Sequence, residues 1–464
     1  MSQATHSQAP AEYSFDSAWS VGNHGRVSAP SDVEQVAESA RGWRVLAPLR
    51  FRDFRLLIAA VAIFIFAEGM WTVVMALQVI ALADDPAALS LVATCLAGGM
   101  LAFILVGGIV ADRLPQRVII IAVEAVNLVA VAAVAVLGML GELRLWHMAV
   151  ASAVLGAGAA FFFPAYSAYL PRILPPQHLL AANGIEGMVR PTLGQAMGPA
   201  SAGMLVGATF PAWGSAAVAV LFAVGLVLLV AIRPKRAENA ERAENAGLLV
   251  AGAPRDRPHP LADLRDGFVF VLRTRWLLWT LLFASVWVLL AMGPMEVLLP
   301  FIARERFVHG GQSYGFLLAA YGLGSALGAL AVSTRPLPRR YLTLMMMLWG
   351  LGSLPLAVVG VTPSFPVMAI ALFVVGVAGG AGMVLWGTLL QRRVPAHMLG
   401  RVSSLDFFVS LSFMPVSMAL AGPLSKVVAV DVIFAVAGVG PIVLAVIALA
   451  AARMPVDEIA HPLN

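Results

Sequence analysis

The chain carries the sequence GGIVADRLPQR at residues 107–117, a short hydrophilic gap between two long apolar segments. Each flanking segment is long enough to cross a bilayer as a helix. Charge is costly in hydrocarbon, so Asp112, Arg113 and Arg117 have to lie at the water boundary. The stretch therefore predicts a compact charged turn that joins two membrane-spanning helices.

Composition extends this prediction to the rest of the chain. Of the 464 residues, 60% are hydrophobic and 12% are charged, whereas soluble domains have about 45–50% and about 25%. The mean hydropathy is +0.88. Helices are expected because an open sheet would leave backbone groups unpaired in lipid. We expect an all-α membrane protein with twelve transmembrane helices at 55–81, 87–111, 117–140, 146–169, 185–207, 212–232, 276–301, 313–333, 341–361, 365–388, 403–425 and 431–452.

The apolar segments form two groups of six. The order of domains that we expect is a disordered cytoplasmic tail at 1–45, a six-helix bundle at 46–232, a cytoplasmic linker with an amphipathic helix at 233–275, a second six-helix bundle at 276–453 and a cytoplasmic tail at 454–464. The first 40 residues are polar and do not resemble a signal peptide.

The two halves echo each other about 220 residues apart: RILP at 172–175 corresponds to RRVP at 392–395, and Gly108 to Gly328. A parallel duplication of this kind predicts two pseudo-symmetric bundles about an axis along the membrane normal.

Charge distribution predicts the orientation. The net charge is +5, but the excess lies on one side of the expected membrane. Of the 30 Lys and Arg residues, all except Arg144, Arg304, Arg306 and Lys426 fall on the side of the two termini. Cytoplasmic loops carry such an excess, so both termini are expected in the cytoplasm of a multi-pass plasma-membrane protein. The basic balance thus indicates topology, and no nucleic-acid partner is expected.

Several classes of chemistry are excluded by what the sequence lacks. A P-loop needs Gly-Lys-Ser/Thr, and the two lysines, Lys235 and Lys426, follow Pro234 and Ser425. The eight histidines fall in tails, loops or span ends, so no buried pair is expected for haem or a metal. Cys95 has no partner for a disulfide. We expect no enzyme activity and no cofactor beyond a proton gradient.

The turn at 107–117 resembles a motif of the major facilitator superfamily, a family of secondary transporters. Its pattern between the second and third helices is Gly-x-Leu-Ala-Asp-Arg-x-Gly-Arg-Arg/Lys. The matching residues are Gly108, Ala111, Asp112, Arg113 and Arg117, whereas Val110 replaces Leu, and Pro115 and Gln116 depart from Gly and Arg. The resemblance implies a cytoplasmic latch of Gly108, Asp112, Arg113 and Arg117, with Asp406 in reach; simple charge anchoring is the alternative.

A second resemblance lies in the fifth span. The family's drug-for-proton exporters carry Gly-x-x-x-Gly-Pro-x-x-Gly-Gly there. The matching residues are Gly194, Gly198, Pro199 and Gly203, with Ala202 in place of one Gly and Ile185 where an earlier Gly is expected. Small residues also let helices approach closely, so ordinary packing is the alternative.

The segments LLQRRVP at 389–395 and LGRVSSLDFF at 399–408 resemble a loop of the exporter branch that includes enterobactin and macrolide efflux proteins, which act as drug:proton antiporters. The likeness runs from about residue 45 to 452. It is specific for the branch and uninformative about the substrate.

An acid inside an apolar span is a functional hypothesis by default. Glu68 lies roughly 19 Å into the first span at about 1.5 Å per residue, near the middle of the membrane. A polar and sulfur-containing stripe on the same helix face would line a cavity with it, formed by Trp71, Thr72, Met75 and Gln78. The alternative is a structural Glu68 that is hydrogen-bonded to a neighbouring helix.

Other intramembrane acids are weaker candidates. Glu124 and Asn127 lie one turn apart in the third span, and Glu186 and Arg190 have the spacing of a structural ion pair. Glu296 is expected near the outer end of the seventh span.

Together these patterns predict a monomeric transporter that exports a small amphipathic compound, a drug, siderophore or secondary metabolite, in exchange for protons. An importer or facilitator of the same fold is the first alternative, and a polytopic membrane enzyme or sensor is the second. Neither the cargo nor the coupling ion, proton or sodium, follows from the sequence.

Overall fold

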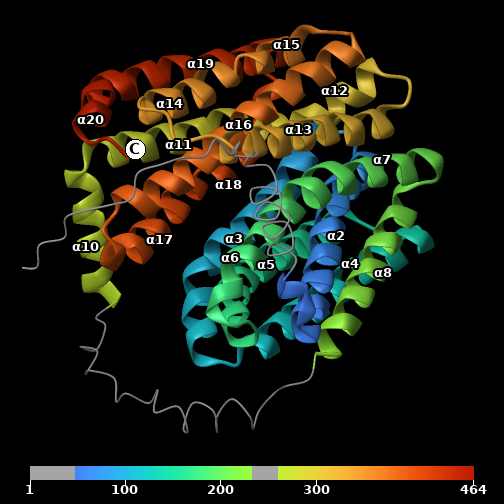
Figure 1. Ribbon diagram of the computed structural model, residues 1–464. Coiled ribbons are helices and arrows are strands. Elements are labelled where there is room, and N and C mark those ends of the chain that lie inside the picture. Colours follow the sequence, from blue (N-terminus) through green and yellow to red (C-terminus); the bar gives the residue numbers. More distant parts are fainter. Residues whose placement is uncertain (1–46, 233–259, 464) are drawn as a thin grey trace, which may run out of the picture. The chain divides into compact units, whose positions relative to one another are not determined.

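The computed structural model describes residues 47–232 and 260–463, and every regular element within these ranges is a helix. The all-α class is therefore confirmed. The tail expected at 1–45 and the linker up to residue 259 lie outside the described residues. Figure 1 shows the first half of the chain in blue to green and the second half in yellow to red.

The first half contains six helical segments after the short 3-10 turn η1 (Ala47–Arg50). They are α2 (Arg52–Leu82), α3 (Pro86–Arg113), α4 (Gln116–Leu140), α5 (Leu145–Ile173), the run α6 (Pro176–Val189), η2 (Arg190–Met197) and α7 (Gly198–Ala208), and α8 (Pro211–Val230).

The second half begins with α10 (Pro260–Arg273), the amphipathic helix expected before the seventh span. The segments that follow are α11 (Arg275–Gly293) with η3 (Pro294–Leu298) and α12 (Leu299–Arg306), α13 (Gly310–Ser333), α14 (Tyr341–Gly352) with α15 (Pro355–Val361), α16 (Phe365–Arg393), α17 (Ala396–Ser412) with α18 (Met414–Ser425), and α19 (Val430–Ala451).

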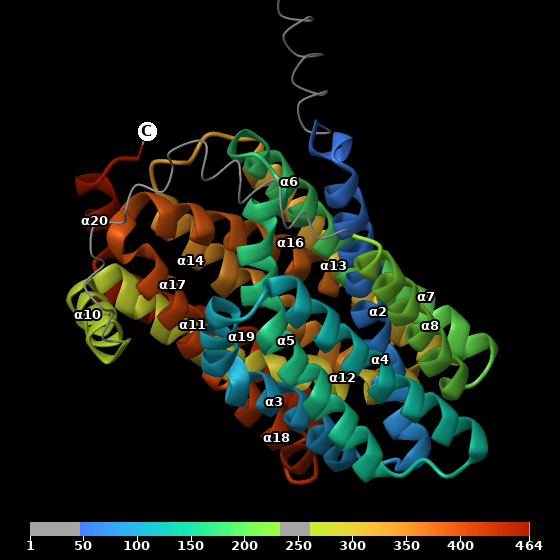
Figure 2. The ribbon, with the colours of Figure 1, turned by 90° about the horizontal axis from the view of Figure 1, so that it is seen from below.

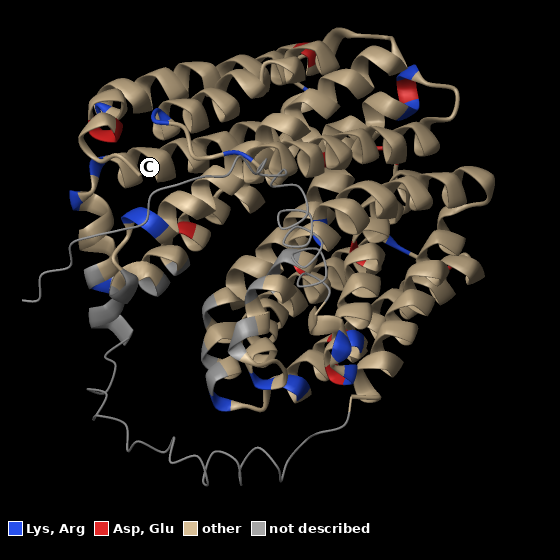
Figure 3. Ribbon diagram, viewed as in Figure 1, with Lys and Arg blue, Asp and Glu red and all other residues tan. Residues whose placement is uncertain are grey.

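Eleven of these segments are long and apolar enough to cross a membrane, judged by length and composition. The expected span at 185–207 is not among them. It is helical from Pro176 to Ala208, but it contains Glu186, Arg190 and Gln195 together with many glycines. Elsewhere, Figure 3 shows charged residues mainly near helix ends, as the cost of burying charge in lipid requires.

Local chemistry sets the helix ends. The Asp85 carboxylate accepts the backbone N–H of Ala87 at 2.9 Å, and Pro86 occupies the first turn of α3, where its missing N–H is not needed. Gly141 ends α4 with φ of 74°, a left-handed conformation that glycine adopts without strain.

Residues 454–460, expected within the C-terminal tail, form helix α20 (Met454–Ala460). Its Glu458 is buried, and its carboxylate accepts the backbone N–H groups of Leu342 and Thr343 at 2.9 and 3.1 Å. An acid that binds free N–H groups stabilises a helix start, so the end of the chain caps α14.

The two halves repeat one close helix pair. In the first half, a Cβ on Gly107 of α3 would lie 2.1 Å from the carbonyl oxygen of Ala160 on α5. In the second half, a Cβ on Gly328 of α13 would lie 2.0 Å from that of Val377 on α16. Both pairs therefore pack backbone against backbone, as glycine allows.

The halves meet where α3 packs against α18 and where η2 and α7 pack against α13 (Figures 1 and 2). The contact of η2 and α7 with α13 is at backbone distance. A Cβ on Gly322 would lie 2.3 Å from the carbonyl carbon and oxygen of Gln195, and one on Gly315 would lie 2.4 Å from the oxygen of Pro199. Only glycine fits at these positions without moving the backbone.

We expect Gly322→Ala to destabilise the protein by about 1–3 kcal/mol, because overpacking at rigid backbone cannot be relieved by a side-chain rotation. Thermal unfolding of the purified protein, followed by tryptophan fluorescence, measures this. Gly387→Ala on α16 is the matched control, since its Cβ meets nothing within 4 Å. Equal melting temperatures for the two variants would contradict the close packing.

Candidate functional site

The stripe expected on α2 divides into buried and accessible parts. Trp71, Met75 and Gln78 are buried, whereas Glu68 and Thr72 retain some exposure. The Thr72 hydroxyl donates to the backbone carbonyl of Glu68 at 3.3 Å, and Met75 sulfur accepts from Ser152 at 3.4 Å. Among the described residues, Trp71 Nε1 and Gln78 Oε1 have no hydrogen-bond partner. Two buried polar atoms on this helix are thus unsatisfied in this state.

Glu68 belongs to a small charged group in the first half. The charge of Arg190, at the start of η2, acts on Glu68, and the charges of Glu68 and Glu124 act on each other. Arg190 is also 3.8 Å from Glu186 and lies over the Phe163 ring at 4.9 Å. The charge of Glu68 thus reaches Glu124, although the sequence placed the two residues in separate spans.

Glu124 is enclosed, with 1% exposure, and its Oε2 has no partner. Asn127, one turn further along α4, is its polar neighbour, and the Asn127 Oδ1 is also unpartnered. Gly158 on α5 leaves room for that amide, since a Cβ there would lie 2.7 Å from Oδ1. A carboxyl group this enclosed cannot exchange freely with water in this state.

The second half contributes one acid of its own. Glu296 lies in the π-helical turn η3, between Pro294 and Pro300, and retains partial exposure. Its charge acts on Tyr314 and Tyr321 of α13. The sequence placed this residue among the weaker candidates, and an acid between two prolines inside an apolar span was the available signal.

The residues of the expected antiporter motif lie where three helices meet. A Cβ on Gly69 of α2 would be 2.1 Å from the carbonyl oxygen of Gly194, and one on Gly198 would be 2.8 Å from that of Phe66. A Cβ on Gly203 would be 3.0 Å from the Cα of Gly315 on α13. Pro199 follows the π-helical turn η2, whose wider turn shifts the helix register at this junction.

The expected latch residues make no contact across the halves within the part of the chain that the structure describes. Arg117 donates to the Val230 carbonyl at 3.0 Å, and Arg113 is exposed without an ion pair. Asp406 accepts from Trp386 at 3.0 Å and from Ser410 at 3.2 Å, both in its own half.

Two other latch residues need separate comment. The Asp112 side chain lies outside the described residues. Gly108 has open space where a Cβ would be, whereas its neighbour Gly107 packs against α5. In this state, Gly107 is the packing glycine of the turn.

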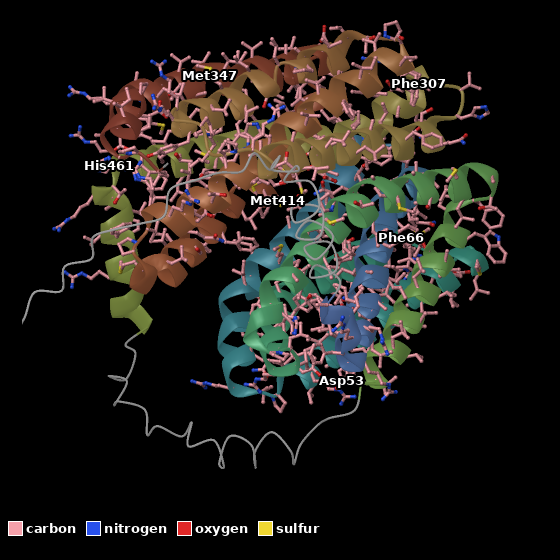
Figure 4. The ribbon with its side chains drawn as sticks, in the orientation of Figure 1. Asp53, Phe66, Phe307, Met347, Met414 and His461 are labelled. Atoms are coloured by element: carbon pink, nitrogen blue, oxygen red, sulfur yellow. The ribbon has the colours of Figure 1, made fainter. Side chains whose placement is uncertain are left out.

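Polar contacts between the halves gather at the opposite ends of the helices. Figure 4 labels Asp53 near the beginning of α2 and Phe307 just beyond α12, at far-apart ends of the spans. Near the Phe307 end, Arg304 donates to both carboxylate oxygens of Asp84 at 2.5 and 2.9 Å. The two residues are 220 positions apart, so the end of the first span is bound to the corresponding end of the seventh.

Two further contacts hold α3 and α18 together at this end. Lys426 donates to Asp85 at 2.8 Å, and the Ser90 hydroxyl accepts the N–H of Gly422 at 2.7 Å. The hydrogen bond from Lys426, with that from the Ala87 N–H, holds the pKa of the Asp85 carboxyl below its usual range. We call Asp84, Asp85, Arg304 and Lys426 the far-end clamp.

Two bundles of long apolar helices, with acids inside each half and polar contacts between the halves at one end, form the architecture of a multi-pass membrane protein. The Major Facilitator Superfamily model matches residues 57–415, and the chain belongs to this family. The expected family is therefore confirmed, and its members are transporters rather than enzymes.

Similar proteins of known identity agree with the family assignment. The enterobactin exporter EntS of Escherichia coli O81 (strain ED1a) is 26% identical over 405 residues, which cover 85% of this chain and 91% of that protein. A mutant of the nucleoside transporter NupG superimposes with a TM-score of 0.66 at 12% identity, covering 85% of this chain and 99% of that one.

A bacterial homolog of the human lysosomal transporter Spinster, solved in an inward-facing and unoccupied conformation, gives a TM-score of 0.59 at 16% identity. It covers 88% of this chain and 98% of its own. At such identities the two structures show the shared fold alone.

We expect Asp84→Arg to open the clamp, because it places like charges in contact. A thiol reporter at Leu77→Cys, in a Cys95→Ala background, reads this out, since Leu77 lies 3.0 Å from a Cβ on Gly311 at the junction of the halves. Labelling by a membrane-impermeant maleimide should rise in Asp84→Arg and fall back when Arg304→Asp is added. Unchanged labelling in the single variant would show that the pair does not hold the halves together.

The Asp85–Lys426 contact gives a pH dependence of known sign. A carboxyl whose pKa is lowered in the paired state contributes stability above its ordinary pKa and loses it as pH falls through the lowered value. Lys426→Gln should therefore lower the melting temperature equally at pH 7 and pH 5, and the difference should vanish only in strong acid. A difference that disappears between pH 7 and pH 5 would assign the effect to another group.

Proposed function

We propose that the protein exports a small amphipathic compound, a drug, siderophore or secondary metabolite, in exchange for protons by alternating access. The two bundles would rock about a site between them, opening to one side of the membrane at a time. The resemblance to an enterobactin exporter supports export from the cell. We place the protein in the plasma membrane as a monomer with both termini in the cytoplasm, on the excess of basic residues at the linker side.

One observation carries this proposal. The polar contacts between the halves are concentrated at the far end, while Glu68 deep in the first half remains partly accessible. With the linker side in the cytoplasm, the clamp closes the outer side. This state would load cargo from the cell interior, as an exporter requires.

Glu68 supplies the chemistry of the site. A carboxylate inside the membrane either binds a positive or hydrogen-bond-donating group or accepts a proton, because it cannot remain charged alone. The unpartnered atoms of Trp71 and Gln78 lie on the same helix and would contact the cargo. The glycine-rich junction of α2, η2 and α13 would serve as the pivot, since close backbones slide with little side-chain rearrangement.

We expect Glu68→Gln to abolish proton-driven export while the protein still reaches the membrane, because the amide keeps the size of the side chain but has neither the charge that binds cargo nor a site for a proton. Inside-out vesicles with an acidic interior, supplied with enterobactin or ethidium as probe, measure uptake. Glu142→Gln, in an exposed loop, is the matched control and should behave as wild type.

The same vesicles decide the rival functions. Probe movement in the opposite direction under the imposed gradient identifies an importer. Probe movement driven by a sodium gradient alone would show that sodium is the coupling ion in place of the proton. Normal proton-driven uptake by Glu68→Gln removes this residue from the mechanism.

A further inference from the structure

Glu296 occupies an unusual position in the second half. It lies within the apolar segment Arg275–Arg306, where the helix widens into the π-helical turn η3. Such turns occur mostly as single turns and often at functional sites. Ser417 of α18 binds the last turn of α11, directly before η3. Its hydroxyl donates to the Leu289 carbonyl at 2.7 Å and accepts the Gly293 N–H at 2.8 Å. The irregular turn is thus held by specific contacts.

The Glu296 carboxylate has no hydrogen bond or ion pair within residues 47–232 and 260–463. The helices packed against η3 are α3, α11, α12, α18 and α19, and the cations of α12 and the lysine that follows α18 are engaged elsewhere. Arg304 and Lys426 bind Asp84 and Asp85, and Arg306 binds the carbonyls of Val359, Gly360 and Thr362. The remaining titratable groups on these helices lie at helix ends or along α3, namely Arg275, Glu305, Asp431, Cys95, Asp112 and Arg113. Among the described residues, the charge of Glu296 acts on Tyr314 and Tyr321 of α13.

Three of the intramembrane acids, Glu68, Glu124 and Glu296, therefore differ in environment. Glu68 has Arg190 within electrostatic reach. Glu124 has no cation and is enclosed. Glu296 has no cation but is partly exposed. A carboxyl group without a cation is stable in such a place only when it is neutral, and its partial exposure distinguishes Glu296 from the enclosed Glu124.

The turn that contains Glu296 is also connected to the far-end clamp. Helix α12 continues directly from η3 and carries Arg304. Helix α18 contacts the turn before η3 through Ser417 and ends at Ser425, one residue before Lys426. A change of charge at Glu296 would thus affect the beginning of both helices whose far ends position the clamp residues Arg304 and Lys426.

We propose that Glu296 carries the proton of the export cycle, whereas Glu68 with Arg190 binds the cargo. The inference rests on the proposed function and divides its two tasks between the halves. When the outer side opens, one proton from outside neutralises the Glu296 carboxylate. When the cytoplasmic side opens, the same proton leaves to the cell interior, so each cycle moves one proton inward through this group.

Two assays on purified protein in liposomes test this division, with the probe, enterobactin or ethidium, that the wild-type protein exports. The first measures net transport driven by a pH gradient. The second measures exchange of labelled for unlabelled probe at equal pH, which needs cargo binding but no net proton movement. Glu296→Gln should lose the first activity and keep the second within about twofold of wild type. Glu68→Gln should lose both.

Glu305→Gln, an exposed position on α12 nine residues later, is the matched control and should keep both activities. Retention of gradient-driven transport by Glu296→Gln overturns the inference while leaving the proposed function intact. Loss of both activities in that variant also overturns it, by placing Glu296 in cargo binding. Absence of any gradient-driven transport in the wild type would instead refute the proposed function.

A second variant covers the case in which Glu296→Gln does not reach the membrane. Glu296→Asp keeps a carboxyl group but withdraws it by one methylene into a different environment. A proton carrier should then remain coupled with a shifted pH optimum for gradient-driven transport. An unchanged optimum and rate would overturn the assignment.

Discussion

The low polarity of the membrane interior is the constraint on which the rest of this structure depends. A charge there must be paired, neutralised or placed at an end. Most charged residues of the chain lie near helix ends (Figure 3). The few acids that remain inside are therefore distinguished by their surroundings. Arg190 lies within reach of Glu68, Glu124 is enclosed, and Glu296 is partly open without a cation.

The same constraint explains how the halves are joined. Water is available only beyond the spans, so ion pairs between the halves can form and break most readily at helix ends. Asp84–Arg304 and Asp85–Lys426 are exposed pairs of this kind. Exposed pairs are individually weak, which suits contacts that have to separate in each cycle. Inside the membrane, the halves meet instead through glycines, as at Gly315 and Gly203.

The proposed cycle connects these two levels. The two cations of the far-end clamp lie on α12 and just after α18, and both helices join or contact the turn that holds Glu296. Cargo binding at Glu68 takes place on α2, whose Gly69 touches the backbone of Gly194 beside the contact with α13. A rearrangement at either acid would therefore be transmitted to the junction of the halves through directly packed helices.

The sequence by itself determined the helical class, the family and the approximate spans, because apolar length and charge spacing are local properties of the chain. It also singled out Glu68, since an acid in a long apolar run is visible without coordinates. Only the tertiary structure brought Arg190 within reach of Glu68, joined Asp84 to Arg304 across 220 residues, and showed that Arg113 and Asp406 lack contacts across the halves in this state. These facts depend on which helices become neighbours. In a bundle of uniformly apolar helices, the neighbours are decided by close backbone packing at glycines. A local pattern of hydrophobicity does not record this packing, so the sequence alone could not predict it.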